Sequence, residues 1–498
     1  MLLLLSVFLL PNGNAVAQQF ELLYNTPVEN SFISVVEEDS SFLLIGNQGK
    51  MPNFTPHYLR ISKSGVIELD SLDQSIDAAV IDIIDFDSTY LLVYNSSSLD
   101  SLWGMEVDKS LKKIKRIRFT LKDSIDPWFY FNGKLSNDKT QLVVTGAKSF
   151  PNLNFKDGFT SFIHLDSSRK DTVVFANRPA RVFAGSNAVV QMGDGKYYVT
   201  GTIRRIDYPN SCNTTIELTR YNADFSLDTN FAVCGEGDTT LGWGFHFRNS
   251  MTQLTDSTFA IASVKQNDFD NQRISEDVAY TVLDTNFKEI NSFVIFKPDS
   301  FAIEGSRNTD KHENSNSFYV GGTERYIIDP SGYNDSNSYF LLRRADLEGN
   351  EICTRLYSNS SYLNLKKVLA TSDGGALMIG TSYDEKTANG LENDVWIVKV
   401  DSNCNYKTIT SLGDNPFIPQ EDFAFFPNPF KEQITFRQFN QSRKLQMQLF
   451  DLQGRKILEK QLWESQVEID LSGLSRGTYL YRLLDEKGKT ASGKIVKQ

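Results

Sequence analysis

The chain has 498 residues and a formal net charge of −11, so it is too long for one small core and we expect more than one domain. The acidic balance argues against nucleic acid as a partner, because phosphate binding needs a basic surface, and it offers no polybasic patch for a membrane. Aromatic residues make up 12 % of the chain, with 35 Phe and 20 Tyr, which favours β structure.

The N-terminus has the pattern of a secretory signal. Met1–Leu10 is almost entirely apolar and is followed by Pro11–Asn14 and the small residues Ala15–Ala17. This predicts a signal peptide over residues 1–17, cleaved after Ala17. The basic residues that usually open such a signal are missing, which leaves a start upstream of Met1 open. The alternative is a buried N-terminal strand. No other stretch approaches the ~20 apolar residues of a membrane span, so we predict no transmembrane segment.

A short apolar run that follows a polar tight turn recurs along most of the chain, every 48 to 62 residues. The turns contain Asp, Asn, Ser and Gly, which suit tight hairpins. The seven runs are Phe42–Gly46, Tyr90–Tyr94, Leu142–Gly146, Tyr197–Gly201, Phe259–Ser263, Phe318–Gly322 and Ala376–Gly380.

Each repeat supplies four short strands. Residues 376–380, for example, are preceded by Lys367–Ala370 and followed by Val395–Val400. The central runs are apolar at consecutive positions, which indicates strands covered on both faces. Blades stacked around an axis provide that cover. We therefore predict an all-β fold, a seven-bladed β-propeller over residues 18–411. A β-solenoid is the alternative, although its repeats are shorter.

Two segments compete to complete the last blade. Phe20–Tyr24 resembles Thr354–Tyr357, which is the outer strand expected in the sixth repeat. Tyr406–Thr410 could occupy the same edge. We slightly favour Phe20–Tyr24, which would close the ring by bringing the two ends of the repeat region together.

Four cysteines fit an oxidising compartment. One or two disulfides are plausible, but the connectivity of Cys212, Cys234, Cys353 and Cys404 cannot be derived from the sequence, and free thiols are the alternative. No CxxC motif supports zinc or redox chemistry.

The sequence contains no recognisable catalytic or cofactor motif. It has four His, each in a different repeat and none in an HExxH pattern, and it lacks GxSxG and Walker sequences. Its acidic runs lack the spacing of a calcium loop. We therefore assign no catalytic, cofactor-binding or metal-binding residue.

Loop lengths are asymmetric. The turns before the apolar runs are tight, whereas the loops after them are long and variable, and alternation of strand direction places these long loops at one end of the ring. The connections between blades reach the same end. We predict that this end binds any partner, because loops carry function while strands position them. The alternative is that the Trp side chains cover the ends of their own blades. The candidate residues are Trp128, Tyr130, Arg204, Arg205, Tyr208, Trp243, His246, Tyr326 and Tyr333.

After Thr410 the repeat stops. Residues 412–422 contain Gly413, Pro416 and Pro419 and are typical of a linker. From Phe423 onward the charge balance becomes positive. Alternating apolar residues in Leu445–Phe450 and Tyr479–Leu483 predict half-buried strands, and Asp451–Gly454 predicts a hairpin turn. Some seven short strands in 75 residues predict a small Ig-like β-sandwich.

The motifs of this segment occur in a specific order: Phe426–Phe430, Asp451–Lys456, Ile469–Leu474, Gly477–Tyr481 and Gly493–Lys497. In this order they resemble the type A C-terminal sorting domain of the type IX secretion system of Bacteroidetes. The resemblance implies recognition by the outer-membrane translocon after export to the periplasm, followed by release or attachment to the cell surface. The alternative is an ordinary adhesive Ig-like module. The motif residues are Pro427, Asn428, Pro429, Asp451, Gly454, Arg455, Leu474, Gly477, Tyr479 and Lys494.

The sequence thus predicts a secreted or surface-displayed propeller that binds a protein or a glycan without catalysis. A hydrolase or lyase acting on glycans or peptides, with acidic residues converging at the pore, is the main alternative. A structural component of the envelope is a third.

Overall fold

The computed structural model describes residues 19–24, 29–49, 53–96, 101–118, 128–150, 155–165, 172–175, 182–205, 214–233, 249–267, 275–294, 302–303, 308–324, 338–359, 361–383, 394–406, 423–438, 444–451, 455–464, 466–485 and 490–498. All regular secondary structure in these ranges is β. The chain divides into an N-terminal unit, Met1–Thr408, and a C-terminal unit, Ile409–Gln498. The predicted signal peptide lies outside the described residues.

Seven antiparallel sheets make up the described part of the N-terminal unit. Sheet 1 holds β2 (Asn30–Glu37), β3 (Ser41–Gln48), β4 (Thr55–Ser62) and β5 (Ile67–Leu72). Sheet 2 holds β6 (Ala78–Asp85), β7 (Thr89–Ser96), β8 (Leu102–Asp108) and β9 (Lys113–Arg118). Sheet 3 holds β10 (Trp128–Leu135), β11 (Gln141–Phe150), β12 (Phe155–His164) and β13 (Thr172–Phe175). Sheet 4 holds β14 (Val182–Gln191), β15 (Tyr197–Arg205), β16 (Thr214–Tyr221) and β17 (Leu227–Val233).

The remaining sheets follow the same order. Sheet 5 holds β18 (Ser250–Gln253), β19 (Thr258–Asn267), β20 (Ser275–Asp284) and β21 (Glu289–Val294). In sheet 6 two short strands, β22 (Ala302–Ile303) and β23 (Thr309–Asp310), pair with β24 (Ser317–Glu324), followed by β25 (Tyr339–Asp346) and β26 (Glu351–Tyr357). Sheet 7 holds β27 (Tyr362–Ala370), β28 (Ala376–Tyr383), β29 (Asp394–Val400) and β1 (Phe20–Tyr24).

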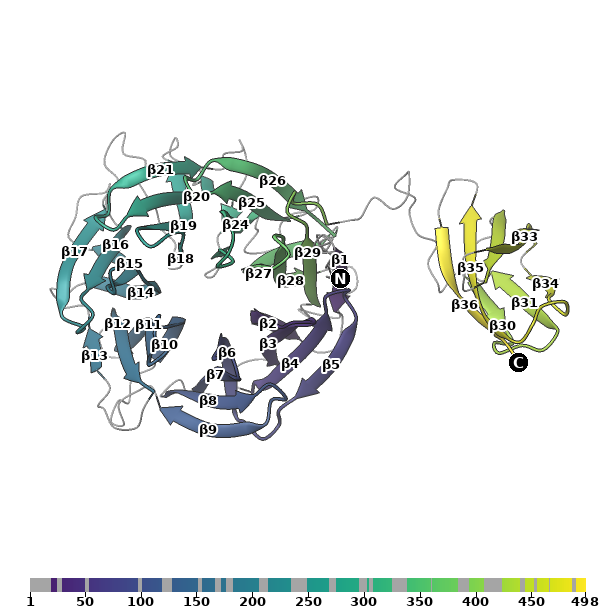
Figure 1. Cartoon of the computed structure of the whole chain (residues 1–498), viewed down its shortest axis with the longest axis horizontal. Helices are drawn as coiled ribbons and strands as arrows, with labels where there is room; N and C mark the ends of the chain where they lie inside the picture. The colour runs from purple at the N-terminus through teal and green to yellow at the C-terminus, as the bar shows by residue number, and fades with distance from the viewer. Residues whose placement is uncertain are drawn as a thin grey trace, which may run out of the picture. The chain divides into compact units, whose positions relative to one another are not determined.

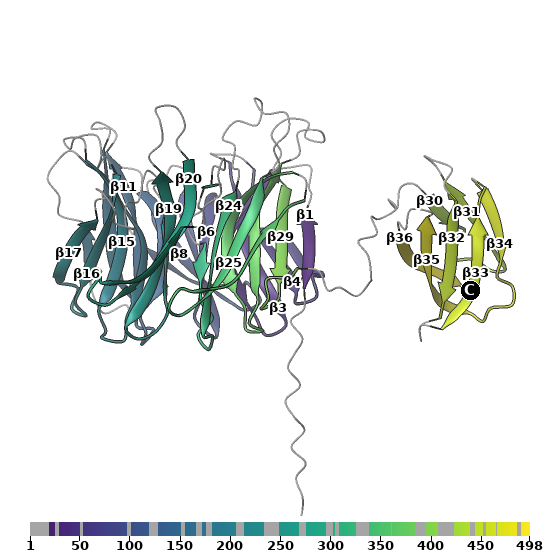
Figure 2. The same cartoon turned by 90° about the horizontal axis from the view of Figure 1, so that it is seen from above.

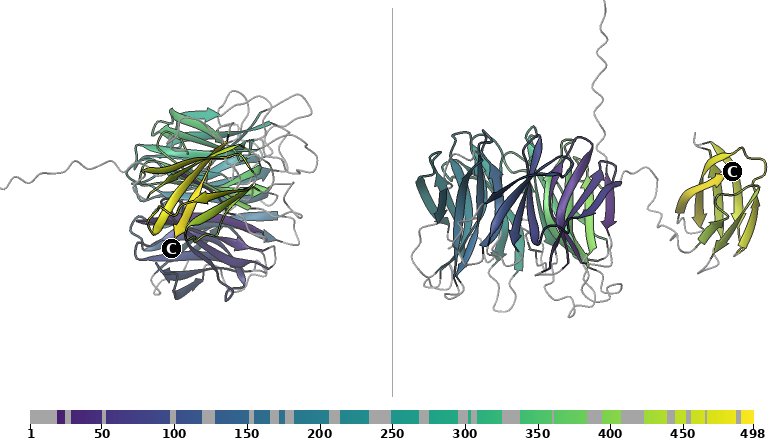
Figure 3. Two further views of the ribbon diagram at one scale, coloured as in Figure 1. Left: turned by 90° about the vertical axis from the view of Figure 1, so that its right-hand side faces the viewer. Right: turned by 90° about the horizontal axis from the view of Figure 1, so that it is seen from below.

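The sheets stand around a common axis (Figure 1), and their strands run roughly along that axis when the unit is seen from the side (Figure 2, Figure 3). Each sheet shares an apolar core with the next in chain order, and sheet 7 shares one with sheet 1. We call each of these interfaces a seam. The second strand of each sheet is therefore covered on both faces: β3 is buried from Ser41 to Asn47, and every residue of β24 is buried. This confirms the interpretation of the consecutive apolar runs.

The turn that follows the third strand of a sheet has a feature that the sequence analysis did not predict. In each of these turns that the structure describes, one residue has a positive φ. These residues are Gly65, Leu111, Phe225, Phe287, Gly349 and Cys404. In the turns that begin with Asp284 and Asp401, that Asp carboxylate accepts backbone N–H groups two and four residues later, at 2.8–2.9 Å. These bonds hold a backbone conformation that L-residues rarely adopt.

The positive-φ side chains pack toward the preceding sheet. Phe225 stacks on Phe162 with ring centroids 4.2 Å apart, and Phe287 meets Tyr198 edge-on at 5.6 Å. Cys404 forms a disulfide with Cys353 of β26, a pairing that the sequence left open. Cys212 and Cys234 lie outside the described residues. The turn thus contributes to a seam as well as reversing the chain.

The ring is closed by β1, as the sequence slightly favoured. It pairs antiparallel with β29, from Phe20 opposite Lys399 to Tyr24 opposite Val395, and forms the outer edge of sheet 7. Of the competing segment, only Tyr406 is described, and its ring lies edge-on to Tyr357 at 5.5 Å. We call the interface between sheets 7 and 1 the closing seam.

The C-terminal unit contains seven strands in its described part. One sheet holds β30 (Phe423–Phe426), β31 (Gln433–Gln438) and β34 (Gln466–Asp470). The other holds β33 (Lys456–Leu462), β32 (Leu445–Phe450), β35 (Gly477–Asp485) and β36 (Thr490–Lys497), in that spatial order. Side chains of both sheets, among them Phe436, Met447 and Leu483, form one core. The alternation predicted for Leu445–Phe450 is confirmed, because its odd-numbered residues are buried and its even-numbered ones are half-exposed.

Candidate recognition surfaces

The predicted binding face is described only in part. Trp128 and Tyr130 lie in β10, opposite Lys148 and Gly146 of β11. Arg204 and Arg205 end β15, opposite Phe183 and Val182. The remaining candidates, Tyr208, Trp243, His246, Tyr326 and Tyr333, lie outside the described residues.

The prediction that the four described candidates sit in loops is wrong: all four belong to strands. The strands extend beyond the apolar runs that reveal them, because an antiparallel ladder is held by backbone hydrogen bonds and continues through polar residues. Trp128 at the start of a first strand and Arg205 at the end of a second strand nevertheless stand at the same end of the ring, in adjacent sheets. The topology therefore keeps these candidates at the end from which the long loops leave.

The described carboxylates whose pKa is shifted are engaged in hydrogen bonds or ion pairs. Every Asp or Glu of the described part with a shifted pKa has it lowered, as at Glu38, where burial favours a higher pKa but hydrogen bonds from Arg60, Ser41 and Tyr90 outweigh it. Asp82, on the innermost strand of sheet 2, accepts a hydrogen bond from Ser34 Oγ at 2.6 Å. Within the same ranges, no three His, Cys, Asp or Glu side chains are grouped so that they could hold a metal ion. These carboxylates therefore act as hydrogen-bond acceptors within and between sheets.

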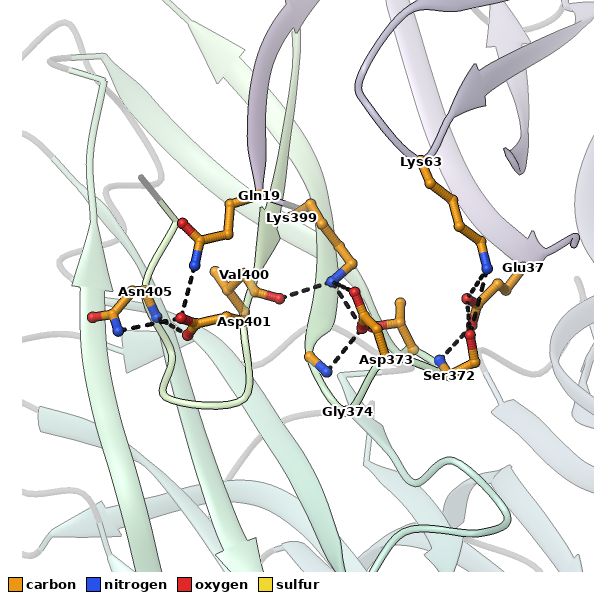
Figure 4. Close-up of polar contacts among 12 residues, drawn as sticks. Gln19, Glu37, Lys63, Ser372, Asp373, Gly374, Lys399, Val400, Asp401 and Asn405 are labelled. Atoms are coloured by element: carbon orange, nitrogen blue, oxygen red, sulfur yellow. Dashed lines mark hydrogen bonds and ion pairs between the residues drawn. The ribbon is translucent and has the colours of Figure 1, made fainter. Parts of the chain in front are cut away.

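The closing seam carries a polar network at its tight-turn end (Figure 4). Glu37 of sheet 1 accepts hydrogen bonds from the N–H and Oγ of Ser372 in sheet 7, at 2.8 and 2.6 Å, and pairs with Lys63 at 2.8 Å. Nearby, the buried Lys399 ammonium contacts Asp373 at 2.8 Å and the Val400 carbonyl at 2.9 Å. Burial favours a higher pKa for Asp373, but the Lys399 charge lowers it below the usual value. The same burial lowers the pKa of Lys399.

The opposite end of the closing seam holds a second polar group. Asp70 of β5 accepts the Tyr24 hydroxyl at 2.7 Å and lies 2.8 Å from His57 Nε2. His57 Nδ1 lies 3.0 Å from Asn30 Oδ1, and the His57 side chain is buried. Burial favours a higher pKa for Asp70, but the bonds from His57 and Tyr24 lower it overall. This group ties β1 to sheet 1.

In the C-terminal unit, the predicted sorting motifs gather at one end. Asn428 donates from Nδ2 to the Lys494 carbonyl at 3.1 Å and accepts the Val496 N–H at 2.9 Å, which fastens the Pro427–Pro429 segment to β36. Asp451, after β32, accepts the N–H of Arg455 at 2.9 Å and its Nε at 2.6 Å. Gly477 begins β35 and pairs with Lys497 near the end of β36. The end of β32, the start of β35 and the end of β36 lie side by side because the three strands pair in that register.

The other motif residues also serve the unit's own structure. Tyr479 is buried and its hydroxyl donates to the Ser475 carbonyl at 2.6 Å. Leu474 packs against the core. Lys494 is exposed, and Gly454 lies outside the described residues. Lys497, which the sequence did not single out, is buried and donates to the carbonyls of Leu471 and Ser472 at 2.7 and 2.8 Å.

The sequence reading also missed a row of cations at the seams. Arg60, Arg220 and Arg344 each lie two residues before a third-to-fourth-strand turn and donate to the turn of the next sheet, at the carbonyls of Lys109, Thr285 and Ser402. The distances are 2.9, 2.6 and 2.5 Å. An Arg at the same offset before three of these turns is a signal that aligned repeats could have revealed.

The fold so described is that of an all-β, propeller-like protein. Residues 424–498 match the family model described as "Secretion system C-terminal sorting domain". The chain therefore carries a type IX secretion sorting domain behind a β-rich unit, and it is exported, either secreted or displayed at the cell surface. In the part of the chain that the structure describes, no helix is long and apolar enough to cross a membrane.

Several solved structures are similar to the chain. One is a puromycin hydrolase S511A mutant complexed with PGG, with a TM-score of 0.47 and 12 % identity, covering 91 % of this chain and 58 % of that chain. Another is Drosophila Semaphorin 2a, with a TM-score of 0.45 and 8 % identity over 97 % of this chain and 98 % of that one. A third is the β-propeller domain of the Trilobed protease from Pyrococcus furiosus, with a TM-score of 0.41 and 7 % identity over 77 % and 98 %. No curated protein matches the sequence.

Proposed function

We propose that the protein is an exported seven-bladed β-propeller that binds a protein or a glycan without catalysing a reaction. Each of the seven sheets is one blade, the propeller spans residues 18–411, and residues 412–422 link it to an Ig-like sandwich at 423–498. Removal of residues 1–17 accompanies export to the periplasm. The sorting domain at residues 424–498 is the observation that carries the exported location.

The contrast between the two ends of the ring supports the binding role. At one end, backbone hydrogen bonds close turns of a few residues, such as Met192 N–H to the Lys196 carbonyl at 3.0 Å and Thr371 N–H to the Gly375 carbonyl at 2.9 Å. At the other end the sequence places long, aromatic-containing connections between β15 and β16, between β17 and β18, and between β24 and β25. Variable loops on a rigid ring are a common basis for recognition.

The export claim is tested by removing residues 423–498 and measuring how much of the chain reaches the cell surface or the medium. We expect the truncated chain to be retained, with the exported fraction falling at least ~10-fold. A truncated chain that still reaches the exterior would show that another route exports it.

The binding claim is tested with the full-length chain on a glycan array and as immobilised bait. Once a partner is verified, Trp243→Ala and Arg204→Ala should each weaken its binding by roughly 10-fold, the scale of one lost interface anchor. The matched control is Lys112→Ala, an exposed residue in a tight turn at the other end of the ring. Unchanged binding by both loop-end variants would exclude this end as the binding surface.

A further inference from the structure

Three motif residues of the C-terminal unit have their polar side-chain groups engaged within the unit itself. Both amide atoms of Asn428 are engaged by β36, both Asp451 oxygens contact Arg455, and the Tyr479 hydroxyl is engaged by the Ser475 carbonyl. A side chain whose hydrogen-bonding groups are already satisfied gains little by offering them again. These motif residues therefore hold the end of the unit in shape.

Next to them, a different set of side chains faces outward. Phe450 of β32 lies directly opposite Leu480 of β35, and Leu480 lies opposite Lys494 of β36. Burial alternates along these strands, so Phe450 and Leu480 point away from the core. Leu480 is 44 % exposed. Ile457 is 38 % exposed and follows Lys456, the residue of β33 that pairs with Phe450.

This outward face is positively charged around its apolar centre. Arg482 lies two residues after Leu480, on the same face of β35. Lys494 of β36 lies beside Leu480, on the side away from Phe450. Both are exposed, and neither has a carboxylate partner in the described part of the unit. By contrast, Lys456, on the other side of Phe450, is paired with Glu459. The face therefore offers an apolar contact bordered by two uncompensated cations.

We infer that this face, centred on Phe450 and Leu480 with Arg482 and Lys494 at its border, is the surface by which the export machinery recognises the sorting domain. The inference rests on the proposed export function. The occupant is a protein of that machinery with an apolar contact bordered by carboxylates, because these complement the exposed Leu and the two cations. The motif residues Asn428, Asp451 and Tyr479 act as positioning residues, since their hydrogen bonds fix the segments beside β36, β32 and β35 at this end.

The test compares variants of the full-length chain in cells that export it. The measured quantities are the exported fraction and the urea midpoint of the C-terminal unit. Leu480→Glu places a carboxylate where the partner's own carboxylates are expected, and we predict a fall in export of at least 10-fold with a nearly unchanged midpoint. Arg482→Gln combined with Lys494→Gln should lower export by about 3-fold, and the loss should grow as ionic strength falls in a binding assay.

Trp463→Glu is the matched control. Trp463 is 65 % exposed and follows β33 at the opposite end of the same sheet, so it represents an equal apolar-to-acidic change away from the proposed face. It should alter export less than 2-fold. If Leu480→Glu lowers the midpoint, Leu480→Thr replaces it, because Thr suits an exposed strand and still removes the apolar contact.

Two results would overturn the inference. One is normal export of Leu480→Glu or its Thr substitute. The other is loss of export in Asn428→Ala with an unchanged midpoint, which would mean that the machinery reads the motif directly. Removing residues 423–498 tests the export route independently of the proposed face. If the truncated chain is retained in the cell while Leu480→Glu is exported normally, the sorting domain directs export but the proposed face does not recognise the machinery.

Discussion

The seam between sheets 4 and 5 and the closing seam solve the same packing problem with different residues. At the first, Phe287 fills the positive-φ position of the turn and Arg220 donates to the Thr285 carbonyl across the seam at 2.6 Å. At the closing seam, the positive-φ residue is Gly65, and a Cβ there would come within 2.9–3.1 Å of the Phe20 side chain. The space that Phe287 fills from its own turn is thus occupied at the closing seam by a residue of β1.

The cation before the turn differs as well. In sheet 7 the position of Arg220 is taken by Lys399, which turns toward Asp373 of its own sheet instead of crossing the seam. The crossing contacts come from Ser372 and Lys63, and from Tyr24 at the other end. Strands β27–β29 of sheet 7 are far from sheet 1 in the chain, so Ser372 meets Glu37 across 335 positions, whereas Tyr24 of β1 reaches Asp70 across 46 positions.

The largest effect is expected at Phe20. Phe20→Ala removes a buried ring whose centroid lies 6.3 Å from that of Phe42 and which also packs against Gly65. We expect the free energy of unfolding of the N-terminal unit to fall by about 4 kcal/mol. Urea unfolding followed by Trp fluorescence measures it. Leu23→Ala, on the same strand but 49 % exposed, should cost less than about 1 kcal/mol. Equal costs for the two variants would mean that β1 contributes no specific packing.

Lys399 should come next. Lys399→Met leaves the Asp373 carboxylate without its buried partner, and we expect a loss of about 3 kcal/mol, the lower end for breaking a buried pair because Asp373 is partly exposed. Adding Asp373→Asn should restore part of the loss, since the uncompensated charge disappears. A double variant less stable than Lys399→Met would contradict the buried-pair explanation.

Tyr24→Phe is a smaller change. It removes the hydroxyl that Asp70 accepts and should cost about 1 kcal/mol. Its counterpart at a seam between consecutive sheets is Tyr280→Phe, which removes a buried hydrogen bond of 2.8 Å to the Gly349 carbonyl. We expect the Tyr280 variant to cost at least as much, because its carbonyl partner belongs to a buried contact whereas water can reach Asp70. The reverse order would show that the closing seam depends more on its polar contacts than the others do.

The smallest effect is a pH dependence at Asp70. The pKa of this carboxyl is lowered in the folded protein, so its contribution to stability is complete above the ordinary Asp pKa of about 4 and is lost as the pH falls below it. Asp70→Asn should therefore flatten the decline of the urea midpoint between about pH 5 and pH 3. An unchanged slope would show that Asp70 contributes nothing to acid sensitivity.

Much of the fold could be predicted from local patterns. The consecutive apolar runs from Phe42 to Gly380 predicted strands covered on both faces, and the polar residues before them predicted the tight turns. Strand ends were harder, as Trp128 and Arg205 show, because a ladder extends as far as its partner allows and side-chain polarity does not record that limit. The sequence revealed the motif residues of the C-terminal unit and their order. It did not reveal that Asn428, Asp451 and Tyr479 form hydrogen bonds within the unit.

The sequence by itself determined the repeat, the two-sided burial of the central strands, the candidate strand for closure and the sorting tail, because each depends on residues close together in the chain. Only the tertiary structure decided that Phe20 takes the place beside Gly65, that Phe287 and Cys404 reach toward the preceding sheet, and that Phe450 and Leu480 face outward side by side. Those choices depend on register between distant strands. The spacing of residues along one strand does not carry that information.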